Sequence, residues 1–170
     1  GCFVNYQQLR VARSHHKMLS TYGGTELLMI GGYTNVPRTT VTDMIERFRR
    51  DAGRGTVIEE LGQLPFGAGE LAAQPIPAIS GGRGGNQAYL VAGGFDGMSL
   101  NSGASRIKES AWAADQAATY EISSLSNDCN LPEERANLEI FDSGNQTLLL
   151  MGGHRYNGSW VATKRVEVYF

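Results

Sequence analysis

The sequence predicts an all-β fold made of repeated antiparallel sheets. Glycine accounts for 22 of the 170 residues, and its clustering in pairs is typical of tight turns along an all-β chain. Four apolar residues run into a glycine pair three times, at Gly31-Gly32, Gly93-Gly94 and Gly152-Gly153. A short apolar run that ends at a chain breaker indicates a buried strand, because a buried helix needs a longer run.

The three copies share their flanking segments as well as the glycine pair. An earlier strand is predicted before each run, at residues 17–21, 73–80 and 137–142, and a turn signal separates it from the run. A loop of about ten residues follows each glycine pair. A third strand is then predicted at residues 43–49, 105–111 and 164–170, and a fourth at residues 56–61 and 119–125 in the first two copies.

An aromatic residue recurs at a fixed offset in two of the copies. Sixteen positions after the second glycine lie Phe48, Ser110 and Tyr169. Together with Arg13-Ser14-His15-His16 at the head of the first unit and Val166-Glu167-Val168-Tyr169 in the last, this pattern resembles the kelch repeat. The tryptophan that usually follows the aromatic residue in that family is missing from every copy.

The resemblance implies a kelch-like β-propeller with three four-stranded antiparallel blades. The blades are predicted at about residues 14–62, 70–126 and 135–170, and residues 2–9 can supply a closing strand for the last one. Closed propellers have about 4–8 blades. The strand count therefore predicts a partial propeller that belongs to a longer one, and self-association into a six-bladed ring is the alternative.

Composition excludes some classes of function. The net charge is −2 and no run of Lys and Arg is present, which argues against a nucleic-acid partner. No stretch approaches the roughly 18 apolar residues that insertion into a membrane needs. The cysteines Cys2 and Cys129 fit neither a zinc pattern nor a redox pair, and whether they form a disulfide is left open.

Two surface features, the glycosylation sequons and the pairs of adjacent glutamates, carry less information about function. The glycosylation sequons at Asn145 and Asn157 slightly favour an extracellular location, although the localisation is left open. The adjacent carboxylates Glu59-Glu60 and Glu133-Glu134 are interpreted as solvated surface, because neighbouring residues of a strand point to opposite faces.

Binding is predicted at the loops that follow the glycine pairs. In a four-stranded meander these loops, at residues 33–42, 95–104 and 154–163, emerge on the same side as the connectors between blades. Arg155 and Trp160 are expected to be exposed, whereas Tyr33, Phe95 and Tyr156 could instead pack against a neighbouring blade. The candidate binding residues are Tyr33, Arg38, Phe95, Asp96, Met98, His154, Arg155, Tyr156 and Trp160.

The resemblance implies a protein–protein interaction scaffold rather than an enzyme. Its partner would be a protein or an extended acidic or polar peptide, and an extracellular glycan- or matrix-binding propeller is the alternative. A galactose-oxidase-like enzyme is a lower alternative, because the three histidines form no convergent ligand set. No catalytic residue, metal or cofactor is therefore expected.

Overall fold

The computed structural model describes residues 8–21, 24–51, 53, 55–77, 87–110, 118–126 and 129–170. The regular elements in this part of the chain are strands, as predicted. None of the described residues forms a helix long and apolar enough to cross a membrane.

The first two sheets each contain four antiparallel strands in chain order. The first sheet consists of β1 (Lys17–Ser20), β2 (Glu26–Ile30), β3 (Met44–Asp51) and β4 (Gly55–Gln63). The second sheet consists of β5 (Ala72–Ile76), β6 (Ala88–Ala92), β7 (Ala104–Glu109) and β8 (Tyr120–Ser124).

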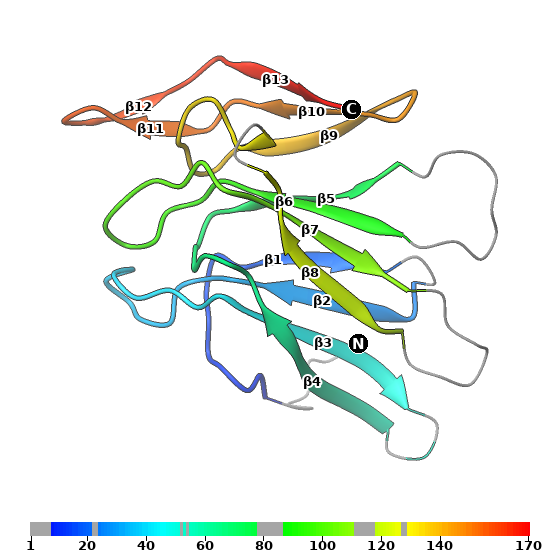
Figure 1. The fold of residues 1–170 in the computed structure, drawn as a ribbon. Coiled ribbons are helices and arrows are strands. Elements are labelled where there is room, and N and C mark those ends of the chain that lie inside the picture. The colour runs from blue at the N-terminus through cyan, green and yellow to red at the C-terminus, as the bar shows by residue number, and fades with distance from the viewer. Residues whose placement is uncertain are drawn as a thin grey trace, which may run out of the picture.

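The third sheet has three strands in the described part of the chain, in the order β13-β10-β9. These are β9 (Glu139–Gly144), β10 (Thr147–Met151) and β13 (Val166–Tyr169). The three sheets are stacked face to face, and the loops after the glycine pairs gather at the left of Figure 1. Most of the proposed closing strand, residues 2–9, lies outside the described residues.

One predicted loop contains regular structure that the sequence analysis missed. Within residues 154–163, β11 (His154–Tyr156) pairs with β12 (Trp160–Ala162) in a two-stranded ribbon. Asn157, Gly158 and Ser159 form the turn of this ribbon, and Gly158 has the positive φ that three-residue hairpin loops commonly place at a glycine. The prediction of an irregular loop was therefore wrong.

The fixed sixteen-residue offset fails in the second copy. Phe48 pairs with Leu27, and Tyr169 pairs with Leu148, at equivalent places in the first and third sheets. In the second sheet the equivalent partner, Tyr89, pairs with Ile107, and β7 ends before Ser110. The loop before β7 is three residues shorter than its counterparts, so the aliphatic Ile107 occupies the aromatic position.

The apolar runs bury one face against each neighbouring sheet. Leu28 and Ile30 of β2 are fully buried against the second sheet, in a cluster that includes Tyr89 and Val91 of β6. The other face of β6 packs against Leu148 and Leu150 of β10 in a second cluster. Burial on both faces explains why the β6 run does not alternate between apolar and polar residues.

The second glycine of the first two pairs joins one sheet to the next. The N–H of Gly32 donates to the carbonyl of Ala68 at 2.9 Å, and the N–H of Gly94 donates to the carbonyl of Arg135 at 2.9 Å. Both glycines have a positive φ. A Cβ on Gly94 would lie 2.7 Å from the Cβ of Ala68, so a larger residue would force the sheets apart.

Two of the three blades have an arginine at this connector position, and its side chain binds its own sheet. Arg13, which precedes β1, donates from Nη1 to the carbonyls of Gly31 and Met44 at 3.0 and 2.9 Å. Its Nη2 pairs with Glu46, and both side chains are fully buried. Arg135 repeats the arrangement in the third sheet by bonding the carbonyl of Gly152 and pairing with Glu167.

The second sheet lacks both partners of this ion pair. Ala68 stands at the position of Arg13 and Arg135, because Ser14, Gly69 and Ala136 form equivalent bridges one residue later. Ser105 stands at the position of Glu46 and Glu167, and its Oγ is buried without a hydrogen bond in the described structure. Both members of the ion pair are replaced together in this sheet, as expected because one buried charge without its partner would destabilise the fold.

We predict that Arg13→Ala and Glu46→Ser each lower the free energy of unfolding by about 3–5 kcal/mol, because each leaves a buried charge unpaired. The double variant copies the second sheet and should cost clearly less than the sum of the two single changes. Urea denaturation of the four proteins measures this coupling. Additive losses would show that the pair does not act as a unit.

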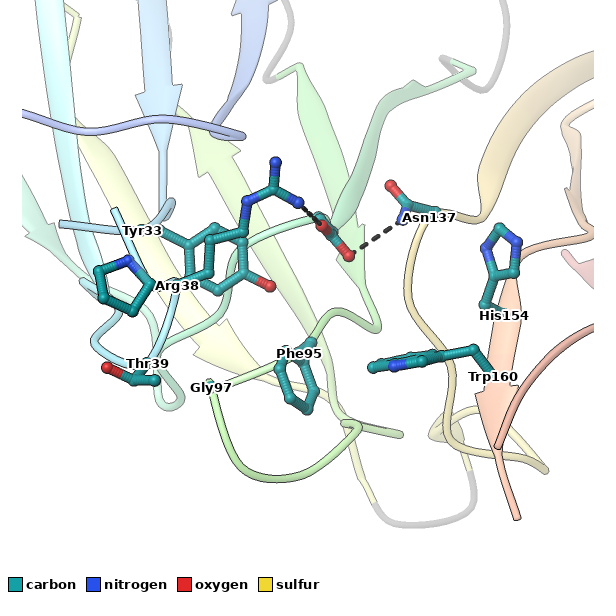
Figure 2. Close-up of a pocket in the computed structure, with 10 residues that line it drawn as sticks. Tyr33, Arg38, Thr39, Phe95, Gly97, Asn137, His154 and Trp160 are labelled. Carbon is teal, nitrogen blue, oxygen red and sulfur yellow. Dashed lines mark hydrogen bonds and ion pairs between the residues drawn. The ribbon is translucent and has the colours of Figure 1, made fainter. Parts of the chain in front are cut away.

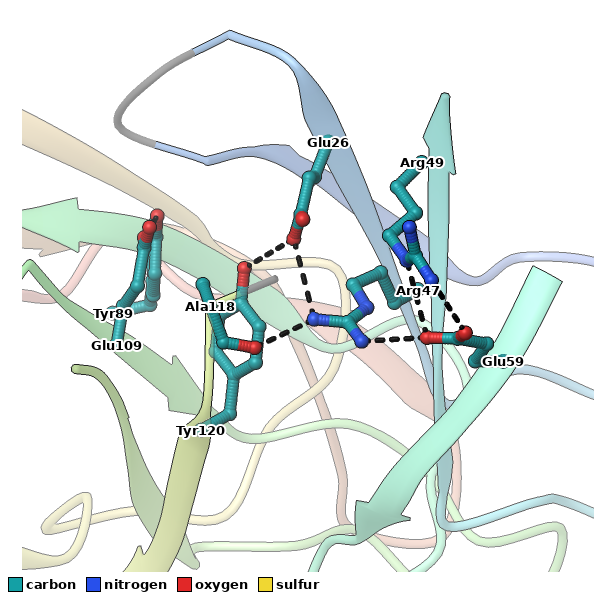
Figure 3. Close-up of polar contacts among 8 residues, drawn as sticks. All are labelled: Glu26, Arg47, Arg49, Glu59, Tyr89, Glu109, Ala118 and Tyr120. Carbon is teal, nitrogen blue, oxygen red and sulfur yellow. Dashed lines mark hydrogen bonds and ion pairs between the residues drawn. The ribbon is translucent and has the colours of Figure 1, made fainter. Parts of the chain in front are cut away.

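A polar cluster links the first two sheets at the end away from the loops (Figure 3). Arg47 donates to the carbonyl of Ala118 at 2.6 Å, and the Tyr120 hydroxyl donates to Glu26 at 2.9 Å. Burial raises the pKa of Tyr120. Glu59 was interpreted as solvated surface, but it accepts from both Arg49 and Arg47, at 3.0 and 2.5 Å.

The two arginines lower the pKa of Glu59 to about 2, with the Arg49 hydrogen bond as the largest cause. A depressed carboxyl pKa stabilises the fold above its ordinary value of 4.5, and this contribution is lost as the pH falls from 4.5 toward 2. Glu59→Gln should therefore weaken the acid dependence of the urea midpoint in that window. Glu60→Gln on the same strand is the control, and parallel acid profiles for Glu59→Gln and the unaltered chain would contradict the prediction.

Candidate functional site

The loops after the glycine pairs are fastened to the connectors between sheets. The first residue of each loop forms an isolated bridge with a connector residue: Tyr33 with Ser14, Phe95 with Gly69 and His154 with Ala136. This confirms that the loops and the connectors emerge on one side of the stack. We call this side of the stack the loop face.

A chain of backbone hydrogen bonds crosses the loop face from sheet to sheet. His15, Glu70 and Asn137 stand at equivalent connector positions, and each has a left-handed φ between 53° and 56°. The N–H of Asn137 donates to the carbonyl of Glu70 at 2.9 Å, and the N–H of Glu70 donates to the carbonyl of His15 at 3.0 Å. Three non-glycine residues in this conformation indicate a tightly determined backbone.

Side chains also fix the shape of the first two loops. The Asn35 carbonyl oxygen accepts from the N–H groups of Thr39 and Thr40, at 3.0 and 3.2 Å. Asp96 accepts from the N–H groups of Met98 and Ser99, at 2.7 and 2.6 Å. These turns lower the entropy that a ligand would have to remove on binding.

The first loop pocket lies among all three loops and has a volume of about 430 Å³. Figure 2 shows Tyr33 and Arg38 on one side, Phe95 and Trp160 below, and Asn137 and His154 on the other side. The pocket is lined by Tyr33, Pro37, Arg38, Thr39, Glu70, Phe95, Gly97, Asn137, His154 and Trp160.

Glu70 organises the polar wall of the first loop pocket. Its carboxylate accepts from Asn137 Nδ2 at 3.0 Å and from Arg38 Nη1 at 3.4 Å. These contacts tie the first loop to the second and third connectors. Arg38 remains about half exposed, so its guanidinium can still reach a ligand.

Tyr33 contributes to this pocket from a buried position. Its ring is only 1% exposed and packs against Gly69, where any side chain would collide with it. Burial, together with the carboxylates of Glu70 and Asp96, raises the pKa of Tyr33 to about 12. The alternative that Tyr33 packs against a neighbouring sheet is therefore correct.

The second loop pocket adjoins the first and shares Phe95 and Trp160 with it. Its volume is also about 430 Å³. Trp160 is in edge contact with Phe95 and Tyr156, with ring centroids 5.3 and 5.6 Å apart. The pocket is lined by Phe95, Met98, Ser99, Leu100, Glu134, Tyr156 and Trp160.

Seven of the nine predicted binding residues line one of the two pockets, and two do not. Asp96 supports its own loop, and Arg155 pairs with Glu133 at 2.8 Å. The expectation that Arg155 and Trp160 are exposed is confirmed. The pockets also contain three polar residues that the sequence analysis did not place there, namely Glu70, Asn137 and Glu134.

The described residues contain no group of three or more His, Cys, Asp or Glu side chains that could hold a metal ion. His154 lines the first loop pocket, whereas His15 packs against the edge of Tyr33. Cys129 is a free, exposed thiol, and Cys2 lies outside the described residues.

No family model matches the chain, and no curated protein matches it. Among solved structures, the chain is similar to one in the cryo-EM structure of RAG in complex with one melted RSS and one unmelted RSS. The match has a TM-score of 0.60 and 18% sequence identity, and it covers 93% of this chain. The matched region of that structure is a propeller.

The fold is all-β and is that of a partial β-propeller. The predicted fold class is thus confirmed, and the three sheets are its blades. This chain spans about half the length of the RAG chain that it matches, 49%. At 18% identity, the likeness shows the fold alone.

Proposed function

We propose that the chain is a protein-recognition module that binds a partner segment across its loop face. The observation that carries the proposal is the pair of adjoining pockets, built from the loops of all three blades and sharing Phe95 and Trp160. We further propose that the chain is a divergent kelch repeat protein, because its repeats and fold agree with that family.

The shape and chemistry of the loop face favour an extended peptide. The two pockets together offer exposed aromatic surface beside a few polar groups, which is the composition of protein interfaces with strong anchor residues. The loops are held by Asn35, Asp96 and the β11–β12 ribbon. A rigid surface of this kind binds with little cost of ordering.

Trp160 is the expected anchor, since it lines both pockets and is 51% exposed. Peptides selected from a random display library on the unaltered chain should lose roughly 30-fold in affinity for Trp160→Ala, the effect of a strong interface anchor. Phe141→Ala on β9 removes another exposed aromatic ring, away from the pockets, and should leave the affinity unchanged. Isothermal titration measures both values, and equal affinities for all three proteins would rule out the loop face.

A carbohydrate is the second candidate ligand. The exposed rings of Tyr156 and Trp160 offer apolar surface on which a sugar can pack. A glycan array probed with the unaltered chain and with Trp160→Ala separates this candidate from peptide binding. We propose no catalytic activity for the chain.

The open face of the third blade is a further contact surface. Leu149 and Met151 occupy the positions of the buried residues Leu28 and Ile30, yet Met151 is 37% exposed. The N–H of Gly153 and the carbonyl of Asn137 have no partner among the described residues, whereas their counterparts in the preceding blades do. At the other end of the stack, the carbonyl of Arg13 and the N–H of His15 are likewise unpaired within the described structure.

The unpaired donor and acceptor of the third blade match the unpaired acceptor and donor of the first. We therefore propose that another blade of the same kind covers the third one, supplied by a second copy or by the rest of a longer chain. Purified alone, the chain should associate above its monomer mass of 18.4 kDa. Light scattering should show that Met151→Glu weakens this association and that Val36→Glu, at an exposed loop position, does not. A stable monomer at tens of micromolar would refute self-association.

A further inference from the structure

The second loop pocket combines aromatic surface with an uncompensated negative charge. Glu134 lines it, is exposed, and makes no ion pair or hydrogen bond in the part of the chain that the structure describes. Its neighbour Glu133, by contrast, pairs with both Arg155 and Arg165, at 2.8 and 2.7 Å. The two adjacent carboxylates therefore have different roles.

The positive groups near the pocket already have partners. Arg155 and Arg165 are bound to Glu133, and Arg38 contacts Glu70. Asp96 adds a second carboxylate to the same side, where its charge is met only by backbone N–H groups among the described residues. Arg155 and Arg165 share the single carboxylate of Glu133, so the three guanidiniums named here face four carboxylates, namely Glu70, Glu133, Glu134 and Asp96. The balance around the second loop pocket is one negative charge, and Glu134 is the charged side chain in its lining.

The walls of the pocket suit the two parts of a long basic side chain. Met98 and Leu100 offer apolar surface to an aliphatic stem. Phe95, Tyr156 and Trp160 stand at steep angles to one another, 80° and 64° between the contacting pairs, so their rings form several walls rather than one flat layer. A cation within about 6 Å of such rings is attracted to their faces.

We propose that the second loop pocket binds an arginine or lysine side chain of the partner, with its cation held between Trp160 and Glu134. This inference rests on the proposed function and specifies its partner. It departs from the acidic peptide that the family resemblance implied, because an acidic side chain would meet the charge of Glu134, and no arginine or lysine is among the residues that line this pocket. It also departs from a neutral sugar, which would not need Glu134.

The test uses a Trp112→Phe background, in which Trp160 is the remaining tryptophan of the two in the sequence. The probes are N-acetyl-arginine amide, its neutral isostere N-acetyl-citrulline amide and N-acetyl-glutamate amide, followed through the Trp160 indole N–H signal in NMR. Arginine should bind about fivefold more tightly than citrulline, the effect of one exposed ion pair with a cation–π contact. The glutamate probe should bind more weakly than both.

Glu134→Gln keeps the size of the side chain and removes its charge, so it should reduce the preference for arginine over citrulline to the part that the cation–π contact with Trp160 supplies. Glu121→Gln removes the same charge from β8, outside both pockets, and should preserve the preference. Equal binding of arginine and citrulline, tighter binding of glutamate, or an unchanged preference in Glu134→Gln would each overturn the proposal.

The peptide selection described above separates this inference from the proposed function. If selected peptides depend on Trp160 but carry no shared arginine or lysine, the basic-side-chain pocket is wrong and peptide recognition stands. If no selected peptide depends on the loop face, the proposed function itself fails.

Discussion

The hydrogen bond from the second glycine of one blade to the connector of the next holds this structure together. Ala68 and Arg135 accept it through their carbonyls, and Arg135 uses its side chain to bind its own blade. One residue thereby fixes both the spacing between blades and the start of a new sheet. The contact is possible because glycine brings two backbones closer than any side chain would allow.

The candidate site follows from this same contact. Glu70 and Asn137 follow Ala68 and Arg135 by two positions in the connectors, and their backbone hydrogen bonds run along the loop face from His15 onward. The Glu70 and Asn137 side chains then continue from these fixed positions into the first loop pocket. Binding groups placed on such a frame are held in position before a ligand arrives, which is the usual advantage of loops on a rigid scaffold.

The sequence predicted the strands well because buried runs and glycine pairs are local signals. It placed Ser110 where Ile107 stands, since a fixed offset cannot detect a loop shortened by three residues. It read Asn157-Gly158 as part of a sequon and so missed the ribbon. Glu70 and Asn137 were not foreseen, because their pairing depends on how connectors of different blades converge, and no local pattern encodes that convergence.

The stacking of the blades determines which part of the molecule unfolds locally first. The middle blade is covered on both faces, whereas Met151 leaves one face of the last blade partly uncovered. Stability in such a stack is approximately a sum of contacts between neighbours, so the ends fray before the middle. Amide protons of β6 should therefore be the last to exchange with solvent, and those of β13 should exchange through brief local openings that leave the first two blades intact.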